Sequence, residues 1–148
     1  MVDHFTKWCE AVPLSCTNAT MVARNIFEQW ITRWGAPEQL HSDRGSNFES
    51  IIVSEMCHPL NIRKTRTTAY HPQGNGAVER ANRSLKALLK AFTDENGSRE
   101  WDIALPHCLL AYRATIHSST GHSPHLLVTG REMRLPFDLT LPRLATDP

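Results

Sequence analysis

Residues 38–48 have the sequence Glu-Gln-Leu-His-Ser-Asp-Arg-Gly-Ser-Asn-Phe, and this stretch carries the pattern that decides the fold. The run from 38 to 42 fits a short strand that ends at Asp43, and the turn at 44–47 leads into a helix predicted over 47–58. A carboxylate in this place projects from the edge of a sheet while the backbone around it is held rigid. The stretch therefore predicts a strand, a tight turn and a helix, with a carboxylate presented between them.

Strands and helices alternate on both sides of this unit. The further elements that we expect are a strand over 7–14, a helix over 18–34, a strand over 61–67, a loop over 70–76, a helix from that loop to a stop at Gly97, a helix over 99–115 that is kinked or starts afresh at Pro106, and a short helix over 123–129. Such alternation predicts an α/β layered domain. We expect the domain to cover residues 1–135 and residues 136–148 to form an irregular tail.

The composition is that of one folded domain. The chain has 148 residues, of which 41% are hydrophobic, and this is enough to bury a core. No apolar run is long enough to span a membrane, and the first residues lack the features of a secretory signal. The cysteines are scattered singly, which favours reduced thiols over disulfides or a metal cage. We therefore expect an intracellular protein, in the nucleus and the cytoplasm.

Positive charge is concentrated in one segment. The whole chain has a net charge of +1, but residues 61–90 contain seven Lys or Arg and one acidic residue, so this segment is +6 and the other 118 residues sum to −5. This asymmetry indicates a local anionic partner, and nucleic acid is the leading candidate. A solvated basic face on a helix would give the same charge, and the charge alone does not separate the two interpretations.

Two carboxylates are candidate ligands for a divalent metal. Asp43 ends a predicted strand, and Glu79 lies one turn into the helix that follows a glycine-rich loop, with 35 residues between them. Such hard oxygen ligands suit Mg²⁺ or Mn²⁺. Two ions about 3.5–4 Å apart can activate an attacking oxygen and stabilise the leaving one in phosphodiester displacement. Each carboxylate taken singly is more often a surface acid than a ligand, and the spacing alone does not overturn that.

A basic track follows Glu79 along the same predicted helix. Arg83, Lys86 and Lys90 lie four, seven and eleven positions after Glu79, a spacing that puts them on one helical face. Such a face can hold a phosphate backbone in a salt-sensitive and sequence-independent way. The alternative is that Glu79 and Arg83 form a routine ion pair that contributes a few tenths of a kcal/mol.

Several longer motifs occur in a defined order. They are Asp-His-Phe-Thr-Lys-Trp at 3–8, His-Ser-Asp-Arg-Gly-Ser-Asn-Phe at 41–48, Tyr-His-Pro-Gln-Gly-Asn-Gly-Ala-Val-Glu-Arg-Ala-Asn-Arg at 70–83, Ala-Tyr-Arg at 111–113, Thr-Gly-His-Ser-Pro at 120–124 and Gly-Arg at 130–131. In this order they resemble the motifs of integrases from gypsy-type long-terminal-repeat retrotransposons, which are similar to retroviral integrases. The resemblance covers nearly the whole chain.

The resemblance implies an RNase H-like fold, in which a mixed β-sheet is flanked by α-helices, and a site of two aspartates and one glutamate that depends on Mg²⁺ or Mn²⁺. It also implies two reactions, which trim the DNA ends of the element and join them to target DNA, and a homo-oligomer in the intact enzyme. By motif, Asp43 is the second catalytic aspartate and Glu79 is the catalytic glutamate. The residues then expected to contact DNA are His71, Gln73, Asn75, Arg80, Arg83, Lys86 and Lys90.

The start of the chain departs from the family pattern. The first catalytic aspartate of the family lies on a strand upstream of the segment that residues 3–8 resemble, so Asp3 is expected to be a non-catalytic residue at the end of the second strand. We therefore expect the first strand to be missing and the chain to be inactive in strand transfer. The alternative is a non-catalytic, host-retained module, derived from an integrase, that binds DNA or protein.

Overall fold

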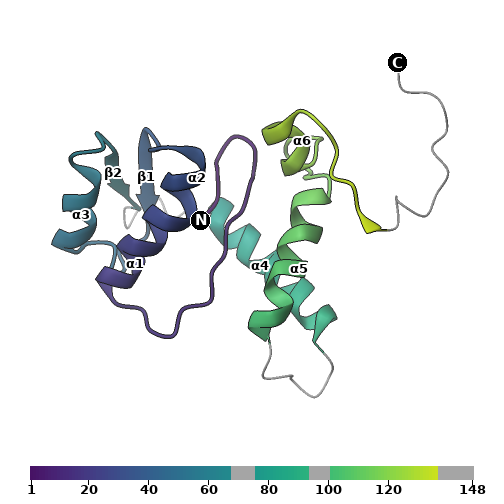
Figure 1. Ribbon diagram of the computed structural model, residues 1–148, viewed down its shortest axis with the longest axis horizontal. Helices are drawn as coiled ribbons and strands as arrows, with labels where there is room; N and C mark the ends of the chain where they lie inside the picture. The colour runs from purple at the N-terminus through teal and green to yellow at the C-terminus, as the bar shows by residue number, and fades with distance from the viewer. Residues whose placement is uncertain (68–75, 94–100, 137–148) are drawn as a thin grey trace.

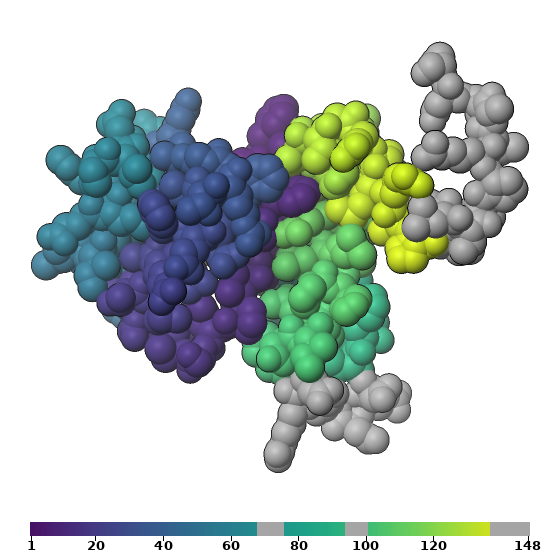
Figure 2. Space-filling view, in the orientation of Figure 1, coloured from purple at the N-terminus to yellow at the C-terminus, as the bar shows by residue number. Residues whose placement is uncertain are grey.

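Residues 1–67, 76–93 and 101–136 are described by a computed structural model of the chain (Figure 1). The sheet and the helices around it form one side of the molecule, the later helices form the other side, and the N-terminal residues run between the two. The same arrangement is visible in Figure 2, where the purple N-terminal residues lie between the blue and green parts. The predicted loop lies outside the described residues apart from Gly76, and so does the tail from residue 137.

The helix predicted over 18–34 forms, but a π-helical turn interrupts it. It consists of α1 (Ala19–Ile26), the π-helix η1 (Phe27–Ile31) and α2 (Thr32–Trp34). Asn18 caps its start, because the side-chain oxygen accepts a hydrogen bond from the backbone N–H of Met21 at 2.8 Å. Its end coincides with Gly35, whose φ of 81° is a left-handed value that favours glycine.

Two short strands form a parallel pair. They are β1 (Gln39–Ser42) and β2 (Arg63–Arg66), and Gln39 lies opposite Arg63. Both strands fall within the segments predicted to be strands. Within the described residues they form the whole sheet, so the sheet seen is smaller than the mixed one expected. α3 (Ile51–Cys57) connects them, as a parallel connection requires.

The helix after Asp43 starts later than predicted. Ser50 is its cap, and the Ser50 hydroxyl accepts a hydrogen bond from the backbone N–H of Val53 at 3.4 Å. The preceding residues instead continue the turn, in which the N–H of Phe48 donates to the carbonyl of Gly45 at 2.9 Å. A serine side chain competes with the helix for backbone partners, which is why the boundary moved to this residue.

The strand predicted over 7–14 is wrong for most of its length. Residues 1–10 form a tight N-terminal hairpin, in which Val2 and Cys9 make an isolated antiparallel bridge. The N–H of Asp3 donates to the carbonyl of Trp8 at 2.9 Å, and Lys7 adopts a left-handed φ of 63° in the turn. The turn therefore occupies the start of the predicted strand, and Pro13, which has no N–H, lies near its end.

Three helices make up the other side of the molecule, namely α4 (Gly76–Phe92), α5 (Trp101–Ala114) and α6 (Pro124–Thr129). The helix does not start afresh at Pro106, which was one of the two predicted outcomes, since α5 is continuous through it. Leu105, Cys108 and Leu109 are buried on both sides of the proline. This packing against α4 outweighs the loss of one backbone hydrogen bond.

The buried apolar residues form two clusters. One joins the N-terminal hairpin to α4 and α5 and contains Cys9, Ala81, Leu85, Leu105, Cys108, Leu109 and Tyr112. The other joins α1, α3 and the start of β2 and contains Ala23, Val53, Cys57 and Ile62. Among the described residues, no helix has the length and apolar character needed to cross a membrane. The hairpin thus belongs to the first of two separate cores.

Candidate active site and nucleic-acid interface

Asp43 immediately follows β1 and is exposed to solvent. Its Oδ1 accepts a hydrogen bond from the backbone N–H of Gly45 at 2.9 Å, and the hydroxyl of Ser42 donates to its carbonyl at 2.9 Å. The bond from Gly45 closes a local turn of the kind that Asp favours. The carboxylate is therefore oriented by its own turn, at the end of a strand, as the sequence predicted.

Gly45 leaves room for the Asp43 carboxylate. A Cβ atom built on Gly45 would lie 3.0 Å from Asp43 Oδ1 and 3.4 Å from Cδ2 of Phe48. Any larger residue would press on the carboxylate oxygen, and on the Phe48 ring behind the turn. The close approach of the carboxylate favours glycine at this position. The backbone conformation does not, since Gly45 is not among the residues with a left-handed φ.

Two hydrogen bonds tie the Asp43 turn to the end of β2. The Nε of Arg44 donates to the carbonyl of Thr67 at 3.1 Å, and the N–H of Thr67 donates to the carbonyl of Ser42 at 3.0 Å. On the other side of the turn, the side-chain amide of Asn47 donates to the carbonyl of Thr17. The turn is thus fixed at both ends to the sheet and to the approach to α1.

Glu79 lies in the first turn of α4 and is exposed. Its position one turn into a helix is the one predicted. His71, Gln73 and Asn75 lie outside the described residues. Within the described ranges, no group of three or more His, Cys, Asp or Glu side chains is arranged to hold a metal ion. A metal shared by Asp43 and Glu79 therefore stays a prediction.

The basic track on α4 is an exposed face of that helix. Arg83, Lys86 and Lys90 are exposed, whereas Ala81 and Leu85 on the opposite side are buried against α5 and the hairpin. No ion pair involves these three cations among the residues that the structure describes. The ion pair considered between Glu79 and Arg83 is thus not formed within 4.0 Å, and the charges of the track face solvent.

The three basic residues of β2 have side-chain partners elsewhere. Glu49 forms two ion pairs: Lys64 Nζ lies 2.9 Å from one carboxylate oxygen, and the guanidinium of Arg66 contacts the other. Hydrogen bonds from Lys64 and Arg66 lower the pKa of the Glu49 carboxyl. Arg63 donates to the side-chain oxygen of Gln39 at 2.6 Å. Among the described residues, most of the positive charge of this segment that no carboxylate neutralises therefore lies on α4.

Comparison with known proteins places this arrangement in a family. Residues 1–72 match the family model described as integrase core domain. The solved catalytic core domain of BIV integrase is 32% identical to this chain, with a TM-score of 0.70, and the match covers 85% of this chain and 80% of that one. The chain belongs to the integrase core domain family. The predicted RNase H-like fold is thereby confirmed.

Relatives of this integrase core come from viruses and from transposons. The Gag-Pol polyprotein of Walleye dermal sarcoma virus is 35% identical over 149 residues, which covers 99% of this chain and 8% of the polyprotein. The retrovirus-related Pol polyprotein from transposon 412 of Drosophila melanogaster is 29% identical over 136 residues, with coverages of 92% and 11%. The integrase core therefore spans about a tenth of these relatives, consistent with one domain of a polyprotein.

A second solved structure supports the fold alone. The catalytic core domain of HTLV-2 integrase, in complex with magnesium and in a trimeric form, has a TM-score of 0.69 and 22% identity. The match covers 84% of this chain and 78% of that chain. At this identity the likeness concerns the backbone, and it transfers no ligand or partner to the present integrase core.

Asp3 is held inside the turn of the hairpin. Its Oδ2 accepts hydrogen bonds from both the backbone N–H and the hydroxyl of Thr6, each at 2.6 Å. A carboxylate oxygen that receives two donors of its own turn has a structural role in shaping that turn. That Asp3 is not a ligand of the active site stays a prediction.

The sequence interpretation did not foresee the role of Arg113. Its Nε and Nη2 donate to the carbonyl of Cys9 at 3.1 and 2.8 Å, and Nη2 also donates to Glu10 Oε2 at 2.6 Å. The guanidinium carbon lies 4.4 Å from the centre of the Trp8 ring. Trp8 in turn donates to Glu10 Oε1 at 3.0 Å. Arg113 thus fixes the hairpin against α5, which gives a structural role to the Ala-Tyr-Arg motif.

Ser123 gives a similar role to the Thr-Gly-His-Ser-Pro motif. Its fully buried hydroxyl accepts from the N–H of Leu126 at 3.1 Å and donates to Glu132 at 2.8 Å. It is therefore the cap of α6, with Pro124 at the first position of the helix. A serine just before a proline was the available sequence signal.

Proposed function

We propose that this integrase core acts in the integration of a long-terminal-repeat element of the gypsy type, in a metal-dependent site to which Asp43 and Glu79 contribute. The observation that carries the proposal is the Asp43 turn, because it presents a rigid, exposed carboxylate at the end of a strand. In the intact enzyme, assembled as a homo-oligomer in the nucleus, this site would trim the element's DNA ends and join them to target DNA.

The donor set fits Mg²⁺ or Mn²⁺. Exposed carboxylates are hard ligands, and these ions retain several waters and take phosphate oxygens as further ligands. When bound, the ions supply charge neutralisation at the phosphate and activation of the attacking oxygen. The chain's own contribution is orientation, since the N–H of Gly45 fixes Oδ1 of Asp43 and the cap and packing of its neighbours fix the turn.

The basic track on α4 would hold the DNA beside this site. Arg80 lies next to Glu79, and Arg83, Lys86 and Lys90 continue along the exposed part of α4. Unpaired cations in a row neutralise successive phosphates without reading bases. His71, Gln73 and Asn75, in the loop before α4, are proposed to contact the DNA end.

We further propose that residues 1–148 alone do not catalyse strand transfer. Two ions need carboxylates that bridge and neutralise both of them. In the described part of the chain, two carboxylates are candidate ligands, and Asp3 is already bonded to Thr6. The presence of two candidate carboxylates, where the family pattern has three, also favours a second candidate function. In this second function the chain is a non-catalytic module that binds DNA or protein.

Metal binding is the direct test of the site. Mn²⁺ binding to residues 1–148 should be measurable by electron paramagnetic resonance, and Asp43→Asn and Glu79→Gln should each weaken it at least tenfold. Glu55→Gln removes an exposed carboxylate from α3 and is the matched control. Equal binding by all four proteins would reject Asp43 and Glu79 as ligands.

Strand transfer is measured separately, with Mn²⁺ and an oligonucleotide that carries a pre-processed element end. We expect no product from residues 1–148. Product that Glu79→Gln abolishes would show that the chain assembles a complete site and would contradict the proposed inactivity. Metal binding without product supports the site and the inactivity together.

A further inference from the structure

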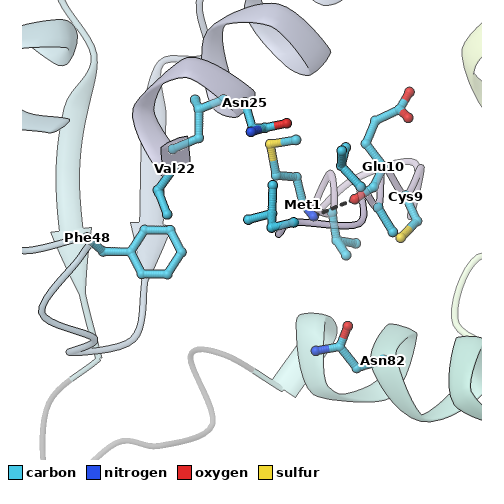
Figure 3. A pocket seen from close by; sticks show the side chains of 12 residues that line it. Met1, Cys9, Glu10, Val22, Asn25, Phe48 and Asn82 are labelled. Atoms are coloured by element: carbon cyan, nitrogen blue, oxygen red, sulfur yellow. Dashed lines mark hydrogen bonds between the residues drawn. The ribbon is translucent and has the colours of Figure 1, made fainter. Parts of the chain in front are cut away.

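The base and the tip of the N-terminal hairpin have different surroundings. At the base, the amino group of Met1 donates to the carbonyl of Glu10 at 2.7 Å, beside a cleft of about 250 Å³ (Figure 3). At the tip, Phe5 lies beyond the bridge between Val2 and Cys9 and belongs to the turn. A strand that pairs with either arm of the hairpin therefore leaves Phe5 in solvent.

Phe5 is the most exposed large hydrophobic residue of the described ranges, at 79%. The turn that carries it is nevertheless fixed by its own hydrogen bonds. The N–H of Lys7 donates to the carbonyl of Asp3 at 3.1 Å, and Lys7 Nζ donates to the carbonyl of His4. The hairpin therefore holds an aromatic ring in solvent on a defined turn, although the exposure of such a ring to water is unfavourable.

Three basic side chains from different segments lie close to this tip. They belong to Lys7 of the hairpin, to Arg80 of α4 and to His117, which follows α5. Burial and then the positive charges of Lys7 and Arg80 lower the pKa of His117, so both cations lie within electrostatic reach of that ring. The hairpin also lies beside α6 (Figure 1), since the centre of the Trp8 ring is 6.3 Å from that of His125.

Within the described ranges, no carboxylate pairs with Lys7 or Arg80. The acidic residue of the turn, Asp3, already accepts two hydrogen bonds from its own turn. His117 Nδ1 accepts a hydrogen bond from the N–H of Ser119 at 3.3 Å, which leaves Nε2 as the donor of the neutral ring. Positive groups that repel one another in this way bind an anion favourably, because its charge offsets the repulsion.

The backbone at Lys7 is not one that lysine favours. Its φ of 63° is a left-handed value, which glycine and asparagine adopt far more readily. A strained residue is a reason to look for a function of its side chain. Because glycine would serve the turn better, the contribution of lysine at this position is its charge beside Phe5.

An exposed aromatic ring beside unpaired cations matches the chemistry of an unpaired nucleotide. The ring stacks on the face of a base, and the cations neutralise the phosphates on either side of it. Bases inside a duplex stack on one another, so their faces are not available to Phe5. An unpaired stretch of DNA offers a free base and a phosphate together.

We propose that the hairpin tip and the two basic side chains beside it, Arg80 and His117, bind the unpaired nucleotides of a DNA strand. A base stacks on Phe5, and the adjacent phosphates lie against Lys7, Arg80 and His117. The inference rests on the proposed function, because trimming one strand of a DNA end leaves unpaired nucleotides on the other strand. It places a DNA contact on the hairpin, in addition to the basic track on α4.

The test measures binding of residues 1–148 to a fluorescent oligothymidine and to a blunt duplex of the same length, by anisotropy without divalent metal. Phe5→Ala should weaken binding of the single strand roughly tenfold and leave duplex binding nearly unchanged, because the stacking on one base is lost. Ile51→Ala is the matched control and should leave both unchanged, since Ile51 is 74% exposed and α3 lies away from the hairpin (Figure 1).

Lys7→Gly separates binding from stability. It removes the charge and should weaken binding of the single strand severalfold, but the melting temperature should stay the same or rise, because glycine accepts the left-handed φ. Lys7→Arg keeps the charge and should bind as the parent does. A lower melting temperature in both variants would show a structural role of Lys7 and would contradict the role given to its charge.

Three further results would overturn the proposal. They are the absence of single-strand binding, equal binding by Phe5→Ala and Ile51→Ala, and a dimer that Phe5→Ala dissociates, since the ring would then contact a second copy of the chain. Mn²⁺ binding is measured separately and needs no DNA. A failure of the nucleotide surface therefore does not count against the metal site, and a failure of the metal site does not count against this surface.

Discussion

The guanidinium of Arg113 and the carboxylate of Glu10 meet across 103 positions of sequence, with Nη2 and Oε2 2.6 Å apart. The side chain of Glu10 is 6% exposed and that of Arg113 is 18% exposed, so the pair is largely removed from water. Arg33 adds a weaker contact to Glu10 at 3.6 Å. The hairpin is thereby attached both to α5, through Arg113, and to α2, through Arg33.

Replacing Arg113 by Ala should be strongly destabilising. The change leaves the Glu10 carboxylate and the Cys9 carbonyl without their main donor, and breaking a buried pair costs about 3–5 kcal/mol. Urea unfolding should show a free energy of unfolding lower by roughly that amount. The control is Arg24→Ala, since Arg24 pairs with Glu28 on the exposed surface of α1, where about 0.5 kcal/mol is expected. Equal effects of the two variants would contradict the role given to the buried pair.

Replacing Gly45 by Ala should weaken metal binding while the fold persists. The added methyl group would lie 3.0 Å from Asp43 Oδ1 and would displace the carboxylate. Loss of such outer support typically lowers metal affinity about 10–100-fold. Mn²⁺ titration is the measurement, circular dichroism reports the fold, and Ser46→Ala in the same turn is the control. If Gly45→Ala binds Mn²⁺ as tightly as the parent does, the geometry of this turn does not control metal affinity.

Removing the basic track should flatten the salt dependence of DNA binding. Each phosphate that the protein neutralises contributes about −0.9 to the slope of log K against log salt. Arg83→Ala, Lys86→Ala and Lys90→Ala combined should therefore make the slope shallower by about 2.7. Fluorescence anisotropy at several salt concentrations measures the slope.

A matched triple variant controls for net charge. Arg24, Arg131 and Arg134 are exposed residues away from α4, and their joint replacement by Ala removes the same charge. This control should leave the slope nearly unchanged. If both triple variants lower the slope equally, DNA binding depends on overall charge and the track has no special part in it.

Glu49 should contribute to stability in a pH-dependent way. Hydrogen bonds from Lys64 and Arg66 lower the pKa of its carboxyl in the folded state. A lowered folded-state pKa stabilises the protein above the unfolded-state value, about 4.3, and this contribution is lost as the pH falls through the folded-state pKa. The stability difference between the parent and Glu49→Gln should therefore shrink as the pH falls from about 5 to 3. For the control Glu55→Gln, the difference in free energy of unfolding from the parent should not change over this pH range. If the difference for Glu49→Gln is also constant, the protonation of Glu49 is not coupled to stability.

Local features of this fold were readable from the sequence, because they depend on neighbours in the chain. The strand before Asp43 and the start of α4 before Glu79 follow from short patterns of apolar residues and glycine. A fresh start of the helix at Pro106 was wrong because α5 packs against α4, and tertiary packing outweighs a local preference.

The contacts that join distant segments were not readable in this way. Glu10 follows a tryptophan and a cysteine in a segment that resembled a simple strand, and nothing nearby in sequence identifies its partner at Arg113. The ion pairs of Lys64 and Arg66 with Glu49 were equally hidden, because Glu49 lies 15 and 17 positions before them and outside the segment whose charge was counted.

The attachment of Arg113 to the carbonyl of Cys9 spans 104 positions, and this has a consequence during protein synthesis. The hairpin is made first, but its partner on α5 is made last among these elements. At roughly 5–20 residues per second, the delay is on the order of 5–20 s. Throughout that interval Trp8 and Cys9 lack the surface that buries them in the finished protein. Trp8 and Cys9 are therefore exposed during synthesis for longer than residues whose packing partners lie close to them in sequence.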